Sequence, residues 1–359
     1  MGKRILVINP GSTSTKVALF CNTRLIRVET LHHTVEQLTG KTLLEQVPFR
    51  MQSIRQFMSS EKPLDAVVGR GGLLHPVESG TYLVNEDMLK DLGSNRYGQH
   101  ASNLGAFMAK LSAEEFGSGC AAMVVDPVVV DELDDVARLS GMPLVPRRSL
   151  FHALNQKAVA RRVAAEMGKQ YADARLVVAH MGGGITVGAH RDGRVIDVNN
   201  GLDGEGPMSP ERCGGLPVTE LVKFCFASGL SREEIDRKLV GKGGLVAHLG
   251  TNDFREVESK SSSDAETATV VGALALQVAK EIGRAMVTLC GCADAIVLTG
   301  GLARSAPFVK QITQYVERFA RVIVIPGEDE ALALAEGALR VLTAKEQPRT
   351  YVRWPDDAA

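Results

Sequence analysis

One pattern of strands and turns occurs twice in this sequence, and it limits the folds that the chain can adopt. The first copy has a strand, a small-residue turn and two more strands, predicted at residues 4–8, 9–12, 15–20 and 25–30. The second copy has a strand, a glycine turn, a strand, a hairpin turn and a strand, predicted at residues 176–179, 182–184, 185–189, 192–193 and 195–198. This repeat predicts two domains of related fold. We expect their turns to face each other across a cleft that could hold a ligand with several phosphates.

Helix and strand patterns alternate through the rest of the chain, which predicts an α/β fold. Helices are predicted at residues 102–115, 149–168, 219–228, 232–239, 264–289, 306–319 and 329–342, and strands at 121–125, 295–298 and 322–325. Ser149 is the predicted N-cap of its helix, and residues 256–264 are a predicted surface loop.

A chain of 359 residues is long enough for two domains. We predict an N-terminal domain at residues 1–146 and a C-terminal domain at residues 147–332. A C-terminal helix at about residues 333–359 is expected to pack back on the first domain.

The overall charge and composition exclude several functions. Lys and Arg number 41 against 42 Asp and Glu, so no global field attracts nucleic acid or an anionic membrane. Aromatic residues make up only 5% of the chain, too few for the stacking that single-stranded nucleic acid needs. The N-terminal apolar run ends at Asn9 and Pro10 and is too short for a signal peptide, so a cytoplasmic protein is expected.

The first turn, residues 9–16, carries small residues, hydroxyl groups and a lysine, which together suit a phosphate. It is not a Walker A loop, because Lys16 begins a strand rather than a helix. An ordinary hairpin and a phosphate site are both open for this turn.

The second turn favours phosphate contact more clearly. Gly182, Gly183 and Gly184 are costly in conformational entropy, and three in a row indicate that a ligand approaches the backbone closely. His180 by itself would more often be a core histidine, so its functional interpretation depends wholly on these glycines. Gly300 and Gly301, between a strand and a helix, are a weaker signal of the same kind.

Two charged residues stand at predicted strand ends. Arg70 lies among glycines and could hold a carboxylate or a phosphoryl group with two hydrogen bonds, although a lone arginine is often only solvated. Asp126 lies where α/β proteins bind ligands, and it could also serve as a turn cap. The acidic run at residues 131–135 is interpreted as a solvated helix start rather than a metal site.

Longer motifs resemble those of the acetokinase family, and among its members the butyrate kinases closely. The family belongs to the superfamily of acetate and sugar kinases, heat-shock ATPases and actin. The motifs that carry the resemblance are INPGSTSTK (8–16), RGGLLHP (70–76), DPVVVDE (126–132), FHALNQK (151–157), NNGLDGEGP (199–207) and RCGG (212–215). They span nearly the whole chain.

The resemblance implies duplicated ribonuclease H-like (actin-like ATPase) domains with a nucleotide cleft between them. It also implies ATP-dependent, reversible phosphorylation of a short-chain fatty acid carboxylate, with butanoate as the expected substrate. The alternatives are acetate, propionate or a branched acid and, more remotely, an actin-like or heat-shock-like ATPase that is not a kinase. We expect ATP/ADP and Mg²⁺ as cofactors, and a homo-oligomer, either a dimer or an assembly of dimers.

Site roles are carried over from the family residue by residue. The catalytic residues so implied are Arg70, Asp126, His152, His180 and Arg212, with His100 in support. The nucleotide-binding residues so implied are Asn9, Ser12, Ser14, Lys16, Gly182, Gly183, Gly184, Asp253, Phe254, Arg255, Gly300 and Gly301. Asn9 and Glu330 are implied to hold magnesium.

Three positions depart from the acetate kinase pattern. Gly183 stands where acetate kinases usually have an asparagine, and Gly69 where they have a histidine. Gly72 stands where they tend to carry a valine, which we interpret as room for a longer acyl chain.

Overall fold

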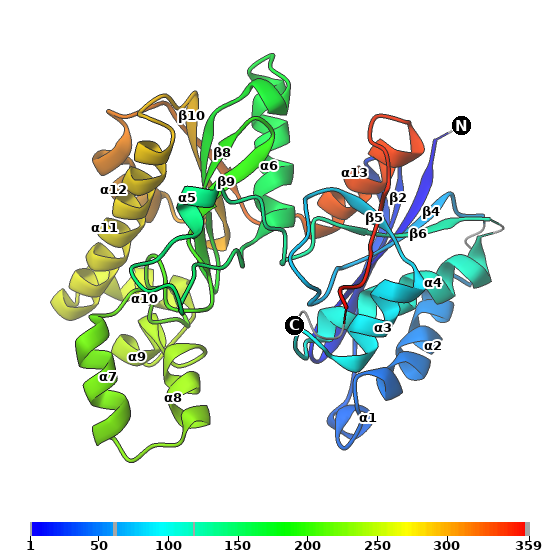
Figure 1. The fold of residues 1–359 in the computed structure, drawn as a ribbon, viewed down its shortest axis with the longest axis horizontal. Coiled ribbons are helices and arrows are strands. Elements are labelled where there is room, and N and C mark those ends of the chain that lie inside the picture. The colour runs from blue at the N-terminus through cyan, green and yellow to red at the C-terminus, as the bar shows by residue number, and fades with distance from the viewer. Residues whose placement is uncertain (1, 60–62, 118, 356–359) are drawn as a thin grey trace. The chain divides into compact units, whose positions relative to one another are not determined.

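The computed structural model describes residues 2–59, 63–117 and 119–355, and they form two compact units (Figure 1). The first unit combines residues 1–130 with residues 329–359, and the second spans residues 131–328. Residues 131–146 therefore belong to the second unit, although the sequence predicted that this unit begins at residue 147. The Asp134 amide donates to the Ile196 carbonyl, and Glu132 pairs with Lys157, so this segment is bonded into the second unit.

The first unit is built on a seven-stranded mixed sheet in the order β12-β5-β6-β4-β1-β2-β3. Its strands are β1 (Arg4–Pro10), β2 (Ser14–Cys21), β3 (Arg24–His32), β4 (Ala66–Gly69), β5 (Thr81–Leu83), β6 (Ala121–Val125) and β12 (Arg349–Thr350). Its α-helices are α1 (Val35–Leu38), α2 (Val47–Phe57), α3 (Glu86–Ser94), α4 (Leu104–Phe116) and α13 (Glu330–Leu342). Short 3₁₀ turns cover Leu44–Gln46 and Ala101–Asn103.

Helices cover both faces of this sheet (Figure 1). Alternate residues of β1, such as Leu6 and Ile8, are buried against α2 and α4, because successive side chains of a strand point to opposite faces. The C-terminal helix α13 packs against β1, β4 and β6.

The second unit has a five-stranded mixed sheet in the order β11-β10-β7-β8-β9. Its strands are β7 (Leu176–Met181), β8 (Ile185–Arg191), β9 (Arg194–Val198), β10 (Ala295–Gly300) and β11 (Val322–Pro326). Its α-helices are α5 (Asp135–Arg138), α6 (Ala153–Glu166), α7 (Val218–Ala227), α8 (Arg232–Leu239), α9 (Gly244–Leu249), α10 (Phe254–Ser261), α11 (Ala265–Thr288) and α12 (Ala306–Val316). Short 3₁₀ turns cover Tyr171–Asp173 and Gly301–Arg304.

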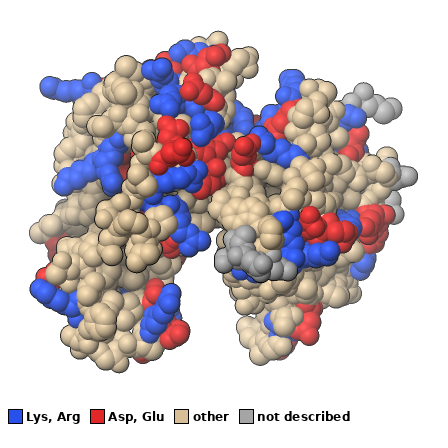
Figure 2. Space-filling view, in the orientation of Figure 1, with Lys and Arg blue, Asp and Glu red and all other residues tan. Residues whose placement is uncertain are grey.

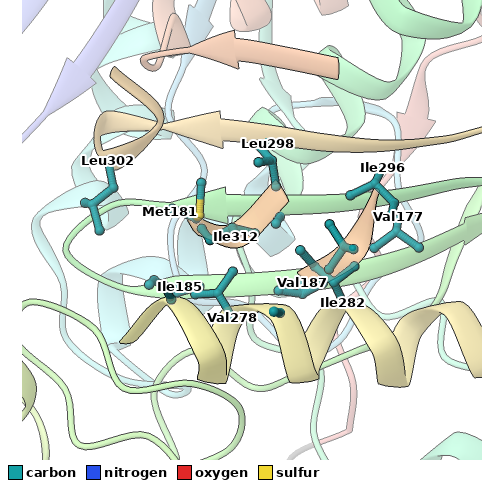
Figure 3. Packing of buried hydrophobic residues seen from close by; sticks show 14 of the residues in the cluster. Val177, Met181, Ile185, Val187, Val278, Ile282, Ile296, Leu298, Leu302 and Ile312 are labelled. Carbon is teal, nitrogen blue, oxygen red and sulfur yellow. The ribbon is translucent and has the colours of Figure 1, made fainter. Parts of the chain in front are cut away.

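The core of the second unit lies on both faces of its sheet. On one face, Val177 and Val187 pack with Val278 and Ile282 of α11 and Ile312 of α12 (Figure 3). On the other face, α6 packs against alternate residues of β7 and β10, with Val159 and Val163 buried against Val178. The site residues of this unit are therefore carried on a rigid layered frame.

The two sheets share one topology, which confirms the duplicated α/β fold predicted from the sequence. In each, three consecutive strands form an antiparallel meander, β1-β2-β3 and β7-β8-β9. Two further strands then pair in parallel beside the first, β4 and β6 in one unit and β10 and β11 in the other. The residues after β1 and β7, and those after β4 and β10, are thus equivalent positions in the two units.

Two local predictions were wrong. Helix α6 begins at Ala153 with His152 at its N-cap position, not at Ser149, because Leu150 accepts a hydrogen bond from Gly201 outside the helix. The predicted loop at residues 256–264 is largely α10, in which Val257 is buried in the core. Its exposed serines have the composition of a loop, but they occupy the outer face of the helix.

Acidic and basic side chains are interspersed over the face of the molecule seen in Figure 2. Of the helices in the described part of the chain, none has both the length and the apolar character that a membrane crossing needs.

Candidate functional site

In the first unit, an asparagine, an arginine and a glutamate meet at the carboxyl ends of two parallel strands. Ile8 of β1 is opposite Gly69 of β4, so the residues that follow them, Asn9 and Arg70, are neighbours. Asn9 Nδ2 donates to Glu330 Oε2 at 2.6 Å, and Arg70 Nη1 lies 2.9 Å from Glu330 Oε1. The structure therefore brings together three of the predicted site residues. Two of them, Asn9 and Glu330, are 321 positions apart in the sequence.

The first predicted phosphate turn joins β1 to β2. The Gly11 amide donates to the Ser14 carbonyl at 2.8 Å, which closes the turn. Ser12 and Lys16 are exposed, and Ser14 is half-buried. Hydroxyl and ammonium donors are thus accessible along this turn.

A buried arginine that the sequence analysis did not single out holds this turn from behind. Arg50 is fully buried on α2, and its Nη atoms donate to five oxygens. The acceptors are the carbonyls of Gly11, Ser12 and Ser14 at 3.0–3.2 Å, with Thr15 Oγ1 and Gln46 Oε1 each at 2.9 Å. None of these acceptors is a carboxylate, so the guanidinium places a positive charge directly under the turn.

The burial of Arg50 changes the pKa values of two groups, its own guanidinium and the ring of His33. Desolvation lowers the pKa of Arg50 to about 10, so it stays charged near neutral pH. Burial, and then the charge of Arg50, lower the pKa of His33 to about 4. His33 Nε2 lies 2.8 Å from Thr15 Oγ1, so a neutral imidazole completes the network under the turn.

Two glycines beside Arg70 are explained by packing. A Cβ on Gly69 would lie 2.1 Å from the Gly105 carbonyl oxygen, because α4 begins directly against the end of β4. A Cβ on Gly72 would lie 2.4 Å from Asn103 Oδ1 and 2.8 Å from Leu92 Cδ2. The interpretation of Gly72 as added room for an acyl chain is therefore wrong, since Asn103 and Leu92 already fill that space.

His100 lies within electrostatic range of the same arginine. Partial desolvation of its ring, and then the charge of Arg70, lower the pKa of His100. Its Nδ1 atom lies 2.7 Å from Ser102 Oγ, just before α4.

Asp126 is buried in the left-handed region, at a φ of 38°. Its Oδ1 accepts a hydrogen bond from the Gly80 amide at 2.7 Å, and its own amide donates to the Gly80 carbonyl at 3.0 Å. Asp126 therefore extends the antiparallel pairing of β5 with β6 by one residue beyond the end of β6.

In the second unit, two histidines stack. The rings of His152 and His180 have centroids 4.1 Å apart and an interplanar angle of 25°. His180, at the end of β7, is fully buried, and its Nε2 lies 3.1 Å from Glu328 Oε1. His152 Nδ1 lies 2.9 Å from Thr186 Oγ1 on β8. Two predicted catalytic side chains are thus held face to face.

The glycine turn between β7 and β8 lies against Arg212. A Cβ on Gly184 would be 2.0 Å from Arg212 Nη1, so a side chain there would displace the guanidinium. The same guanidinium donates to the Gly201 carbonyl, and Ser209 Oγ donates to the Gly183 carbonyl at 2.6 Å. Desolvation lowers the pKa of Arg212, and the nearby Glu211 offsets part of that effect.

The contacts of this turn thus explain, in a way that the sequence could not show, why two of its residues are glycine. Gly184 makes room for Arg212, and a Cβ on Gly182 would lie 2.8 Å from Glu328 Oε1. Only around Gly183 is the space less crowded, with Glu211 Oε2 at 3.7 Å. Two of the three glycines therefore bring the protein's own charged groups onto the turn.

The predicted adenosine triplet stands at the start of α10. Asp253 caps that helix and pairs with Arg255, whose Nη2 lies 2.8 Å from Asp253 Oδ2. The hydrogen bonds from Arg255 lower the pKa of Asp253 to about 2. Phe254 packs edge-on against Phe308 of the core, with ring centroids 5.0 Å apart. Arg255 itself remains exposed.

The predicted nucleotide glycines differ from each other. Gly300 has a φ of 91°, and a Cβ there would lie 2.4 Å from the Met181 carbonyl oxygen, so packing against β7 explains it. Nothing lies within 4 Å of a Cβ on Gly301. Only Gly301 leaves open space that a ligand could enter.

The donor set in the first unit fits a magnesium ion held mainly by its substrate. Among the residues that the structure describes, no three His, Cys, Asp or Glu side chains gather so as to hold a metal by themselves. Glu330 and Asn9 do provide one carboxylate and one amide within hydrogen-bond distance of each other. Mg²⁺ typically takes one or two such ligands and completes its shell with phosphate oxygens and water.

Sequence reasoning missed residues that support the predicted ones, chiefly Arg50, Gln156 and Glu328. A signal existed for Arg50, because it lies on the apolar face of its helix with Val47 and Ile54. A cation on such a face is expected to have a specific polar partner.

A protein-family model described as "Acetokinase family" matches residues 141–335, which is more than half of the chain. Among solved structures, a propionate kinase from Francisella tularensis subsp. tularensis SCHU S4 is similar, with 20% sequence identity and a TM-score of 0.76. That match covers 93% of this chain and 98% of the other.

An acetate kinase from Porphyromonas gingivalis is similar at 19% identity and a TM-score of 0.76, over 95% of this chain and 100% of the other. An acetate kinase from Entamoeba histolytica is similar at 17% identity and a TM-score of 0.74, over 93% of this chain and 98% of the other. At these identities the likeness establishes a shared fold.

Proposed function

Because the chain belongs to the acetokinase family, we propose that it is an ATP-dependent kinase that converts butanoate and ATP reversibly to butanoyl phosphate and ADP. The observation that carries this proposal is the packing of Arg212 onto the glycine turn beside the stacked histidines His152 and His180. An arrangement of this kind supplies positive charge and N–H donors, which a phosphoryl transfer between two anions needs.

The proposed reaction requires no strong base. The carboxylate of the acid is already charged, and one of its oxygens attacks the terminal phosphorus of ATP. An O–P bond forms as the bond to the β-phosphate oxygen breaks, and ADP leaves with the electron pair. The protein must therefore neutralise and align two negatively charged reactants rather than remove a proton.

We assign the residues to this reaction as follows. Arg70 and Arg212 neutralise the carboxylate and the equatorial phosphoryl oxygens, and His152 and His180 donate N–H groups to the developing charge. Asp126 orients the carboxylate through its fixed position at the end of β6.

Nucleotide binding is assigned to the two turns and to the start of α10. Asn9, Ser12, Ser14 and Lys16 of the first turn and residues 182–184 of the second receive phosphates, supported by the charge of Arg50 under the first turn. The open space beside Gly301 is assigned to the nucleotide, and Gly300 positions Gly301 by packing against β7. The adenosine is assigned to the start of α10, where it would contact Asp253, Phe254 and Arg255.

Asn9 and Glu330 would hold Mg²⁺, which supplies charge neutralisation on the nucleotide phosphates when bound. The ion pair of Glu330 with Arg70 holds that carboxylate in place.

The choice of butanoate rests on the sequence motifs, because Gly72 does not open a larger pocket. Acetate, propionate and branched acids are therefore the alternatives within the same proposal. A cytoplasmic location and a homo-oligomer, either a dimer or an assembly of dimers, also belong to the proposal on the sequence grounds given above. Sedimentation analysis of the purified protein would measure the oligomer.

A hydroxylamine trap tests the proposal directly. Acyl phosphates react with hydroxylamine to give hydroxamates, which form coloured complexes with ferric iron. ATP and Mg²⁺ are therefore supplied with acetate, propionate, butanoate or isobutanoate in turn. We expect the highest kcat/KM with butanoate. ATP hydrolysis without hydroxamate for any acid would instead indicate an actin-like or heat-shock-like ATPase.

A pair of arginine variants ties the activity to the site. Arg212→Gln is expected to lower kcat by about two to three orders of magnitude, as loss of one electrostatic donor does in other enzymes. Arg318→Gln alters an exposed arginine after α12 and should keep the wild-type rate. Equal rates for the two variants would remove Arg212 from the mechanism.

A further inference from the structure

A line of buried polar side chains runs through the second unit and ends at His152. Thr186, Gln156 and His190 are all fully buried, and Tyr171 stands at the far end. The neighbouring atoms are Tyr171 Oη and His190 Nδ1 at 2.8 Å, His190 Nε2 and Gln156 Oε1 at 3.0 Å, Gln156 Nε2 and Thr186 Oγ1 at 2.9 Å, and Thr186 Oγ1 and His152 Nδ1 at 2.9 Å. Buried polar groups of this kind are costly unless every one has a partner.

One contact determines which atom donates and which accepts in every hydrogen bond of this line. Gln156 Nε2 lies 3.0 Å from the Thr186 carbonyl oxygen, which can only accept a hydrogen bond. The amide nitrogen of Gln156 must therefore face Thr186, and its oxygen must face His190. His190 Nε2 then has to carry a proton, and His190 Nδ1 accepts from the Tyr171 hydroxyl.

The same contact determines what Thr186 offers to His152. Gln156 Nε2 donates to Thr186 Oγ1, which occupies one acceptor position on that hydroxyl and leaves its proton for the remaining neighbour. That neighbour is His152 Nδ1. A proton on Nδ1 would oppose the Thr186 hydroxyl proton, so Nδ1 accepts and Nε2 carries the ring proton.

Two further observations agree with a line of neutral donors. Burial, followed by the charges of Lys157 and Arg161, lowers the pKa of His190 well below its usual value, so this ring is neutral and has one N–H to give. Gly188 leaves the space that the line needs, because a Cβ there would lie 2.5 Å from Gln156 Oε1 and 3.2 Å from His190 Nε2.

We propose that Gln156 and Thr186 are positioning residues that hold His152 as a neutral imidazole protonated on Nε2, ready to donate that N–H to the transferring phosphoryl group. The donation step rests on the proposed function, whereas the tautomer of His152 follows from the hydrogen bonds of this unit alone. Hydrogen bonds aligned in one direction polarise each other, which strengthens the terminal donor. A neutral donor also avoids a fixed cation that would bind ATP as tightly as the transition state.

Nitrogen NMR of the folded enzyme tests the tautomer without an activity measurement. The chain has 8 histidines, and in protein carrying ¹⁵N-labelled histidine the His152 ring is assigned by comparison with His152→Gln. Long-range proton–nitrogen correlations distinguish the bare nitrogen from the protonated one. We expect the wild-type ring in the Nε2–H form alone. A ring protonated on Nδ1, or a mixture of both forms, overturns the assignment.

Three variants separate positioning from structural support. Thr186→Val keeps the shape of the side chain and its carbonyl contact but removes the hydroxyl, and we expect a mixture of tautomers and a kcat about tenfold lower. The KM values for ATP and the acid should change less than twofold. Thr186→Ser should restore the wild-type nitrogen signals and most of kcat.

Tyr171→Phe removes the distant end of the line and should leave the His152 signals unchanged, because the Thr186 carbonyl still orients Gln156. Wild-type kcat and nitrogen signals in Thr186→Val would refute the positioning role. If the wild-type ring is Nε2–H but no acyl phosphate forms with any acid, the proposed function fails and the tautomer assignment stands.

Discussion

Replacing Arg50 with methionine should destabilise the first unit and weaken nucleotide binding together. Arg50→Met keeps most of the side-chain volume on α2 but removes five hydrogen-bond contacts, three of them to carbonyls of the turn between β1 and β2. Hydrogen bonds to a charged group contribute about 1.5–3 kcal/mol each in mutational series. Water can reach the turn carbonyls, and the variant also loses the desolvation cost of a buried guanidinium. We therefore expect a net loss of about 2–4 kcal/mol.

The effect on ATP follows from the position of the charge. Without Arg50 the turn carbonyls are no longer held on one side, so the amide and hydroxyl groups of the turn lose their common orientation. We expect the KM for ATP to rise at least about tenfold, equivalent to about 1.4 kcal/mol, with the KM for the acid little changed. The stabilisation that saturating ATP gives in thermal unfolding should shrink in parallel.

Arg55→Ala is the matched control for this experiment. Arg55 is on the same helix and makes an exposed ion pair with Glu115, at 2.9 Å, whose loss should cost less than about 1 kcal/mol. Urea unfolding and steady-state kinetics are measured on both variants and the wild type. If Arg50→Met proves as stable as Arg55→Ala and has the wild-type KM for ATP, the argument about the turn is refuted.

Three further predictions concern other parts of the two units. Gly184→Ala puts a Cβ 2.0 Å from the Arg212 guanidinium, so kcat should fall about tenfold or more by displacement of that charge, while circular dichroism stays unchanged; a wild-type kcat would show that this contact is dispensable. Lys157→Met removes the ammonium 2.6 Å from buried Glu132 and should cost about 3–5 kcal/mol in urea unfolding, with partial recovery in the double variant with Glu132→Gln. An equal loss in both proteins would contradict the ion-pair explanation. His33 has a folded-state pKa of about 4 and takes up its proton more readily in the unfolded chain. Its contribution to the free energy of unfolding is therefore complete above about pH 6.5 and is lost as the pH falls toward 4, at most on the order of 1–3 kcal/mol. The free energy of unfolding of His33→Gln should depend less on pH over this range.

Much of the fold could be predicted because the periodicity of the sequence is strong where the chain is buried. The strand at residues 121–125 was predicted to the residue, and β10, β11, α8 and α11 were predicted within about two residues of their ends. Two features failed where local composition competed with tertiary contacts. The serines near the end of α10 have the composition of a loop, so the sequence predicted a loop there. The start of α6 depends on a hydrogen bond from the Gly201 amide to the Leu150 carbonyl, which no local sequence pattern reveals.

The sequence predicted which residues form the candidate site, but it did not predict why the glycines are there. The motifs brought Asn9, Arg70 and Glu330 into one hypothesis, and the structure places these three in contact. The reasons for the glycines were inferred less well. The sequence predicts space for substrate at Gly72, but Asn103 and Leu92 fill that space. Gly184 makes room for Arg212 of the same chain. A sequence shows that a side chain is missing without showing which group occupies the space.

Isotope transfer from the acid to the phosphate is the most direct test of the central claim, that a carboxylate oxygen attacks the terminal phosphorus of ATP. The enzyme is incubated with ATP, Mg²⁺ and butanoate labelled with ¹⁸O in both carboxyl oxygens, and the acyl phosphate is then cleaved by hydroxylamine. Hydroxylamine attacks the acyl carbon, so the bridging oxygen remains with the phosphate. We predict that the released inorganic phosphate carries one ¹⁸O atom. Unlabelled phosphate, formed at the same rate with or without the acid, would contradict the account.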